Sequence, residues 1–84
     1  MENCIIMCRS LTYVQRAVKL LEREGIRARL AKAPQGVTPE GCSYGVKLGM
    51  KNLDRALFYI NSAGIRSGKI FRLDELGRGE ELTR

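Results

Sequence analysis

Residues 17–27 read Ala-Val-Lys-Leu-Leu-Glu-Arg-Glu-Gly-Ile-Arg, and residues 56–66 read Ala-Leu-Phe-Tyr-Ile-Asn-Ser-Ala-Gly-Ile-Arg. The first alanine and the final Gly-Ile-Arg recur at the same spacing in both stretches. Each stretch has the apolar spacing of a helix that ends at a glycine, with an isoleucine placed to pack back on the last turn. The repeat predicts that the chain uses one strand-helix-strand unit twice.

The residues around the repeat complete these two units. Ser10 is placed to cap the first helix and Asn52 to cap the second. Apolar or alternating runs predict four strands, at Cys4–Cys8, Arg27–Ala33, Tyr44–Leu48 and Ser67–Leu73. The order of elements predicts an α+β, ferredoxin-like βαββαβ sandwich. In that fold two helices cover one face of a four-stranded antiparallel sheet, whose strands lie in the order fourth, first, third, second.

The chain is short enough to be one domain, which we expect over residues 1–74, followed by a polar, flexible tail over residues 75–84. A chain of 84 residues buries only roughly 60 to 65 percent of its unfolded surface, so homodimerisation would add stability.

Neither a membrane span nor a secretory signal is apparent in the sequence. No run approaches the roughly 20 apolar residues of a spanning helix, and the first residues lack the pattern of a signal peptide. We therefore expect a cytoplasmic protein without membrane contact. In that compartment Cys4, Cys8 and Cys42 are expected to stay reduced rather than to form disulfides.

Several kinds of chemistry are excluded by residue type. The chain has no histidine, which removes a Cys-His pair, an imidazole base and a mixed Cys/His zinc site. It also has no phosphate-binding loop and no dinucleotide fingerprint. We expect no metal and no cofactor, and a carrier or accessory protein is favoured over a turnover enzyme.

The stretch from Pro34 to Gly45 is the strongest candidate for a functional site. It holds both prolines, three of the nine glycines and Cys42, which predicts a shaped loop with an approachable thiol where the third strand begins. The predicted strand order places this thiol beside the end of the first strand and the N-terminus of the first helix. Cationic side chains and that helix end favour a reactive thiolate over a packed thiol. The expected supporting residues are Arg9, Ser10, Lys32, Gly41, Ser43, Arg66 and Lys69, with Cys8 as a candidate resolving thiol.

The same residues resemble a known family. The segments Ser10–Tyr13, Ala17–Leu21, Gly25-Ile26, Ala33-Pro34 and Gly41–Val46 are similar to small bacterial domains of unknown function described as selenium/sulfur carrier-like proteins. Cys42 matches the characteristic cysteine of that family, although Ser43 stands where members often have glycine. The resemblance implies that Cys42 holds sulfur or selenium as a persulfide or perselenide, and that the partners are donor or acceptor proteins.

A second hypothesis is a non-catalytic regulatory or RNA- or protein-binding module in which Cys42 is structural. Its basis is the formal net charge of +6 and the four-stranded pattern. Nucleic acid is the less favoured partner, because the first strand has no aromatic residue to stack on a base. Alkylation of Cys42 in the native protein distinguishes the two hypotheses.

Overall fold

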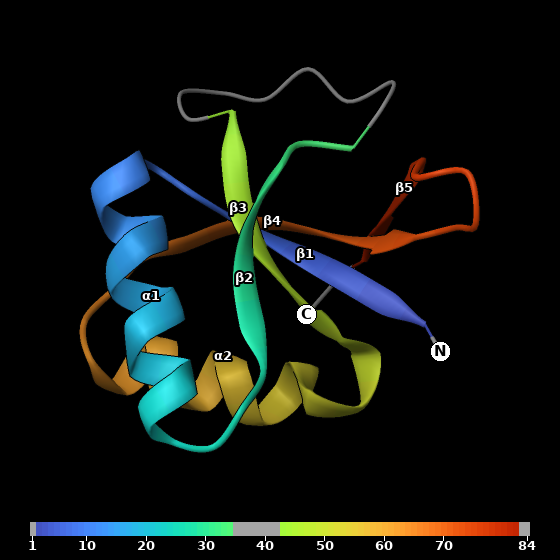
Figure 1. Cartoon of the computed structure of the whole chain (residues 1–84). Coiled ribbons are helices and arrows are strands. Elements are labelled where there is room, and N and C mark those ends of the chain that lie inside the picture. The colour runs from blue at the N-terminus through green and yellow to red at the C-terminus, as the bar shows by residue number, and fades with distance from the viewer. Residues whose placement is uncertain (1, 35–42, 83–84) are drawn as a thin grey trace.

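Strand β1 (Asn3–Cys8) lies at the centre of a five-stranded antiparallel sheet, shown in Figure 1. Its neighbours are β3 (Tyr44–Gly49) and β4 (Ser67–Leu73); β2 (Ala28–Lys32) lies outside β3, and β5 (Gly79–Leu82) lies outside β4. This computed structural model describes residues 2–34 and 43–82. The order β2-β3-β1-β4 is the one expected for the first four strands, read from the opposite edge.

The expectation of four strands is wrong, because a fifth strand forms within the segment predicted to be a flexible tail. A turn at Asp74 reverses the chain, with Gly77 at a φ of 80°, and β5 then pairs with β4. The polar composition of β5 concealed it, since its acidic side chains meet basic ones on β4. The guanidinium of Arg72 lies 3.1 Å from the Glu80 carboxylate directly across the two strands.

Helix α1 (Leu11–Arg23) begins and ends at the predicted residues. The side chain of Ser10 accepts a hydrogen bond from the Tyr13 backbone N–H at 3.3 Å, which caps the first turn. At the other end Gly25 takes a φ of 82°, and the Ile26 N–H donates to the Leu21 carbonyl at 2.8 Å. This is the predicted glycine-terminated helix end.

Helix α2 (Leu53–Ser62) repeats this ending but starts differently. Gly64 takes a φ of 77°, and the Ile65 N–H donates to the Ile60 carbonyl at 3.1 Å. The 3₁₀ turn η1 (Met50–Asn52) leads into the helix, and the structure describes no capping hydrogen bond from the Asn52 side chain. The 3₁₀ turn takes the place of a side-chain cap, since the N–H of Leu53, the first residue of α2, donates to the Met50 carbonyl.

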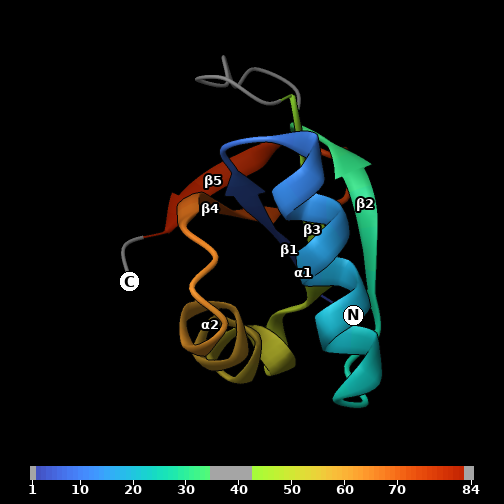
Figure 2. The same ribbon diagram turned by 90° about the vertical axis from the view of Figure 1, so that its left-hand side faces the viewer.

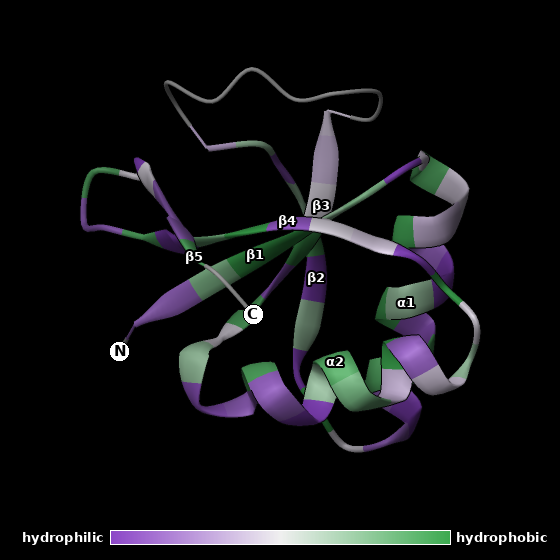
Figure 3. Cartoon of the chain, turned by 180° about the vertical axis from the view of Figure 1, so that it is seen from behind, coloured by the Kyte–Doolittle hydropathy of each residue, from purple (hydrophilic) through white to green (hydrophobic). Residues whose placement is uncertain are grey.

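Both helices pack on the same face of the sheet, as Figure 2 shows. The core between them takes alternate residues of β1, namely Cys4, Ile6 and Cys8, together with the apolar stripes of α1 and α2. Figure 3 shows most of β1 as hydrophobic and the helices as alternating hydrophobic and hydrophilic bands. None of the helices in residues 2–34 and 43–82 is long and apolar enough to cross a membrane.

A second, smaller cluster lies on the other face of the sheet. Ile5 and Met7 of β1 meet Phe71 of β4 there, and all three are buried. Ala31 and Ala33 pack against this cluster, so the chain leaving β2 lies against the face that carries no helix. The path from β2 into the predicted cysteine loop is therefore held by apolar contacts.

Candidate functional site

The base of the predicted cysteine loop is closed by a backbone hydrogen bond. The Ala33 N–H donates to the Ser43 carbonyl at 2.8 Å, one step beyond the last pair of the β2–β3 ladder, Lys32 and Tyr44. Gly41 and Cys42 lie outside the described residues, so their predicted roles stay predictions. Cys42 nevertheless directly precedes Ser43, whose backbone position is set by this bond.

The strand order brings the expected neighbours of the loop to one end of the sheet. In the β1–β3 ladder Met7 pairs with Gly45, so the end of β1 lies beside the start of β3, as predicted. Arg9 follows β1 and is exposed, and Ser10 then caps α1. The N-terminus of α1 is therefore at the end of the sheet where Ser43 enters β3. A helix N-terminus favours anions because its first N–H groups lack carbonyl partners within the helix.

Cys8, the candidate resolving thiol, is buried, and its role stays a prediction. Its side chain is 3% exposed and belongs to the core between the sheet and the helices. The thiol lies 3.9 Å from the Ile6 carbonyl oxygen, with the geometry of a weak S–H donor. A resolving role would require Cys8 to leave this core. Cys4 is fully buried on the same face of β1.

A β-bulge interrupts the β1–β4 ladder next to Cys8. Ile6 pairs with Ile70, but Cys8 pairs with Ser67, so one extra residue is accommodated on β4. Bulges increase the local twist and redirect side chains. Because Ser67 begins β4 opposite Cys8, the bulge also sets where Arg66, the residue before the strand, lies at this end of the sheet.

The predicted cations differ in their surroundings. Lys32 at the end of β2 and Arg66 before β4 are exposed, like Arg9, and none of the three forms an ion pair within residues 2–34 and 43–82. Lys69 lies further along β4, and its ammonium is 4.0 Å from the Glu81 carboxylate of β5. Both partners are exposed, so the pair contributes little stability. Its acidic neighbour makes Lys69 the weakest of the predicted supporting cations.

Gly45 is a positioning residue that sequence reasoning missed. A Cβ atom at this position would lie 2.7 Å from the Ile6 carbonyl oxygen, 2.8 Å from Cγ1 of Ile5 and 3.0 Å from Sδ of Met7. The absence of a side chain therefore lets β1 approach β3 close to the cysteine loop. A glycine within an alternating strand is the available signal, since it often marks a close approach.

The contact between Pro34 and the fifth strand was also missed. A Cβ atom on Gly79 would come within 2.8 Å of both Cβ and Cγ of Pro34 and within 3.1 Å of Cβ of Phe71. Pro34, the last described residue before the loop, is buried. The C-terminal hairpin thus holds the start of the loop, and no local sequence pattern signals a contact between segments so far apart.

Metal binding finds no support in the described part of the chain. Residues 2–34 and 43–82 contain no group of three or more Cys, Asp or Glu side chains placed to hold a metal ion.

Comparison with known protein families identifies a match for most of the chain. No curated protein and no solved structure matches the chain significantly. The family described as "Putative Se/S carrier protein-like" matches residues 3–72. This range runs from the start of β1 into β4, spans the whole predicted cysteine loop and ends before β5. The chain therefore belongs to this Se/S carrier-like family.

Proposed function

We propose that Cys42 carries a sulfur or selenium atom, as a persulfide or perselenide, from a donor protein to an acceptor protein. The observation that carries the proposal is the family match, which covers residues 3–72 and so includes Cys42. The closed loop base at Ala33 and Ser43 supports it, since a carrier thiol needs a defined position as well as access to its partners.

Loading is an atom transfer without net oxidation or reduction. The Cys42 thiolate attacks the outer sulfur of a donor persulfide, and a new S–S bond forms at Cys42. The donor's S–S bond breaks, and its electron pair leaves on the donor thiolate. Delivery repeats the exchange: a nucleophile of the acceptor attacks the outer sulfur, and Cys42 leaves as a thiolate. Selenium takes the place of the outer sulfur in the perselenide form.

The surroundings of Ser43 favour an anion. Exposed Arg9, Lys32 and Arg66 follow or precede strand ends on this side of the sheet, and helix α1 begins there. Cations and helix N-termini lower the pKa of a cysteine thiol and so raise its thiolate fraction at neutral pH. Delivery by the acceptor's nucleophile needs no second thiol from this chain, which agrees with the burial of Cys8.

Glutathione persulfide and intact-protein mass spectrometry test the proposal directly. The wild-type chain is expected to gain the mass of one sulfur atom, and Cys42→Ser is expected to gain none while keeping its circular dichroism spectrum. Cys8→Ala serves as the matched control and should load like wild type. Retention of the added sulfur by Cys42→Ser would overturn the proposal.

Alkylation separates the carrier from a module in which Cys42 is structural. Trypsin releases Cys42 alone, in the peptide Ala33–Lys47, and Cys4 with Cys8 in Met1–Arg9. We expect iodoacetamide to label the first peptide rapidly, with an apparent pKa below the ~8.5 of free cysteine. Labelling of Cys42 only after unfolding would favour the structural module instead.

A further inference from the structure

An open groove lies at the other end of the sheet from Pro34 and Ser43. It has a volume of about 1020 Å³ and collects residues from the end of α1, the start of β2, the end of β3 and the η1 turn. Its charged lining residues are Glu22, Arg27, Arg29, Lys47 and Lys51. Four cations thus face one carboxylate across a single concave surface.

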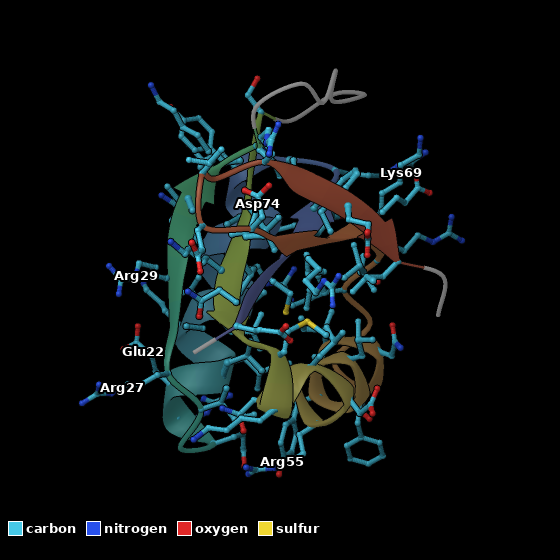
Figure 4. All side chains as sticks on the ribbon, turned by 90° about the vertical axis from the view of Figure 1, so that its right-hand side faces the viewer. Glu22, Arg27, Arg29, Arg55, Lys69 and Asp74 are labelled. Atoms are coloured by element: carbon cyan, nitrogen blue, oxygen red, sulfur yellow. The ribbon has the colours of Figure 1, made fainter. Side chains whose placement is uncertain are left out.

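These four cations differ from other cations of the described residues in their ion pairing. Within residues 2–34 and 43–82 none of them forms an ion pair, whereas Lys69, Arg72 and Arg78 each do. Arg27, Arg29 and Lys51 are exposed, and Lys47 is half-buried. Figure 4 shows Arg27 and Arg29 projecting from the same edge of the domain as Glu22, with Lys69 on the opposite side. The groove therefore has an unneutralised positive charge.

Two of the cations are direct neighbours in the sheet. Arg29 of β2 and Lys47 of β3 are paired residues in the ladder, and like charges directly opposite each other destabilise a sheet. Charges on an edge strand often prevent unwanted pairing between sheets, and that would account for Arg29. It does not account for Lys47, which lies on the inner strand β3, or for Lys51 in the turn. A ligand that neutralises the cluster does account for all of them.

The chemistry of the groove favours a peptide over a nucleic acid. No aromatic residue lines it, so it lacks the stacking platform on which single-stranded nucleic acids are usually bound. Glu22 only accepts hydrogen bonds, and a peptide backbone offers an N–H donor to it at nearly every residue. The start of the edge strand β2, Ala28 and Arg29, also lines the groove, and an extended peptide can pair with an exposed strand edge.

We infer that this groove binds an acidic, extended segment of a partner protein, which pairs with the start of β2 and places its carboxylates against Arg27, Arg29, Lys47 and Lys51. The groove lies at the ends of β2 and β3 remote from Pro34 and Ser43. A partner held there leaves the cysteine end of the sheet accessible. The inference does not depend on the proposed chemistry of Cys42.

Fluorescence anisotropy with a labelled, short oligo-glutamate tests the inference. Binding is expected at low ionic strength and should weaken as salt is added, because exposed charges are screened. The double variant Arg29→Glu/Lys47→Glu should bind at least about tenfold more weakly, since two attractions become repulsions. In the ¹H–¹⁵N spectrum of the wild-type chain, the amides of the groove residues are expected to shift on titration.

The matched control is Arg16→Glu/Arg55→Glu, which changes the net charge equally at two exposed positions outside the groove. With both double variants compared at about 0.15 M ionic strength, where the Debye length is about 8 Å, the control should keep its affinity within about threefold because charges outside the groove are largely screened. Arg29→Gln/Lys47→Gln removes the charges without introducing acidic groups, and should also bind more weakly even if the reversal variant fails to fold.

Three results would overturn the inference. The first is an equal loss of affinity for oligo-glutamate in the groove and control variants, and the second is the absence of binding at low salt. The third is tighter binding of a single-stranded RNA of equal charge that shifts the same amide signals. The last result would assign the groove to nucleic acid. Cys42→Ser is expected to bind oligo-glutamate like wild type, so failure of the carrier proposal and failure of this one are distinguishable.

Discussion

Pro34 lies so close to Gly79 that a Cβ atom at position 79 would come within 2.8 Å of both its Cβ and its Cγ atoms. The contact joins the residue that leads into the cysteine loop to the first residue of the fifth strand. It also covers part of Phe71, in the smaller apolar cluster on the sheet face without helices. The C-terminal hairpin therefore does more than extend the sheet, because it fixes the start of the loop.

Gly79→Ala tests this contact. The added methyl group must displace Pro34, and overpacking of this kind costs typically about 1 to 3 kcal/mol in the free energy of unfolding. Urea unfolding measures the loss. If the contact positions the loop, the rate at which iodoacetamide labels the Ala33–Lys47 peptide should change as well.

Gly49→Ala is the matched control for this substitution. A Cβ atom there would meet only Cγ of Lys51, at 3.9 Å, which is ordinary van der Waals contact. We expect a change in stability of under about 1 kcal/mol, in the range of unstrained glycine replacements. Equal losses at positions 79 and 49 would show that the Pro34 contact is not the cause.

Gly45→Ala is expected to be more damaging than Gly79→Ala. The added Cβ would approach the Ile6 carbonyl oxygen, which is fixed in the central strand, in addition to two side chains. Backbone in the middle of a sheet cannot move aside as the ring of Pro34, just beyond the end of β2, can, so we expect a loss of about 3 kcal/mol or more. Urea midpoints for the two variants, compared with Gly49→Ala, give the order. A loss smaller than that of Gly79→Ala would contradict this account.

Much of the fold was predictable because its signals are local. The helix ends at Gly25 and Gly64 follow from a glycine that can take positive φ, and each isoleucine after it donates the expected hydrogen bond. The order of the first four strands was expected by analogy with the ferredoxin-like fold, which the two similar units suggested. The helix ends depend on interactions between residues a few positions apart, and the spacing of apolar residues and glycines in the sequence reveals such local interactions.

The fifth strand and the loop anchor were not predictable in this way. Glu80 and Glu81 show no apolar alternation; Arg72 and Lys69 of β4 face their carboxylates, and only Leu82 of this strand packs against the core. Pro34 and Gly79 meet only after the sheet has formed. The burial of Cys8, in contrast, was within reach of the sequence: a period of two places it on the same face of β1 as Cys4 and Ile6.

The buried cysteines provide a further prediction. Cys4 and Cys8 are at most 3% exposed, so the Met1–Arg9 peptide should resist alkylation in the native protein and react once urea unfolds the chain. Cys8→Ala removes a small buried side chain and should cost about 1 kcal/mol of stability, near the typical value for a point mutation. If iodoacetamide labels Met1–Arg9 in the native protein as fast as Ala33–Lys47, the result would contradict this prediction and support a resolving role for Cys8.

The turn before β5 gives a prediction about pH. The Asp74 side chain accepts hydrogen bonds from the backbone N–H groups of Arg78 at 2.8 Å and Leu76 at 2.9 Å, and from Nε of Arg78 at 3.1 Å. These bonds, that from the Arg78 backbone above all, lower the pKa of Asp74 below its ordinary value. A carboxylate with a lowered pKa stabilises the folded chain fully above the unfolded pKa of about 3.9, and this contribution is lost as the pH falls through the folded pKa.

Asp74→Asn is therefore expected to be less stable than wild type at neutral pH, with a difference that shrinks in acid, where protonated Asp74 resembles the amide. Thermal unfolding of both proteins, from neutral pH to below the unfolded pKa of about 3.9, measures the difference in stability. Glu75→Gln is the control, because no hydrogen bond from the described residues reaches the neighbouring Glu75 side chain. Asp74 closes the turn that brings Gly79 next to Pro34. Acid should therefore lower the protection of the Gly79–Leu82 amides against hydrogen exchange, after correction for the pH dependence of the intrinsic exchange rate. A stability difference between Asp74→Asn and wild type that stays constant down to strongly acidic pH would rule out the carboxylate as its source.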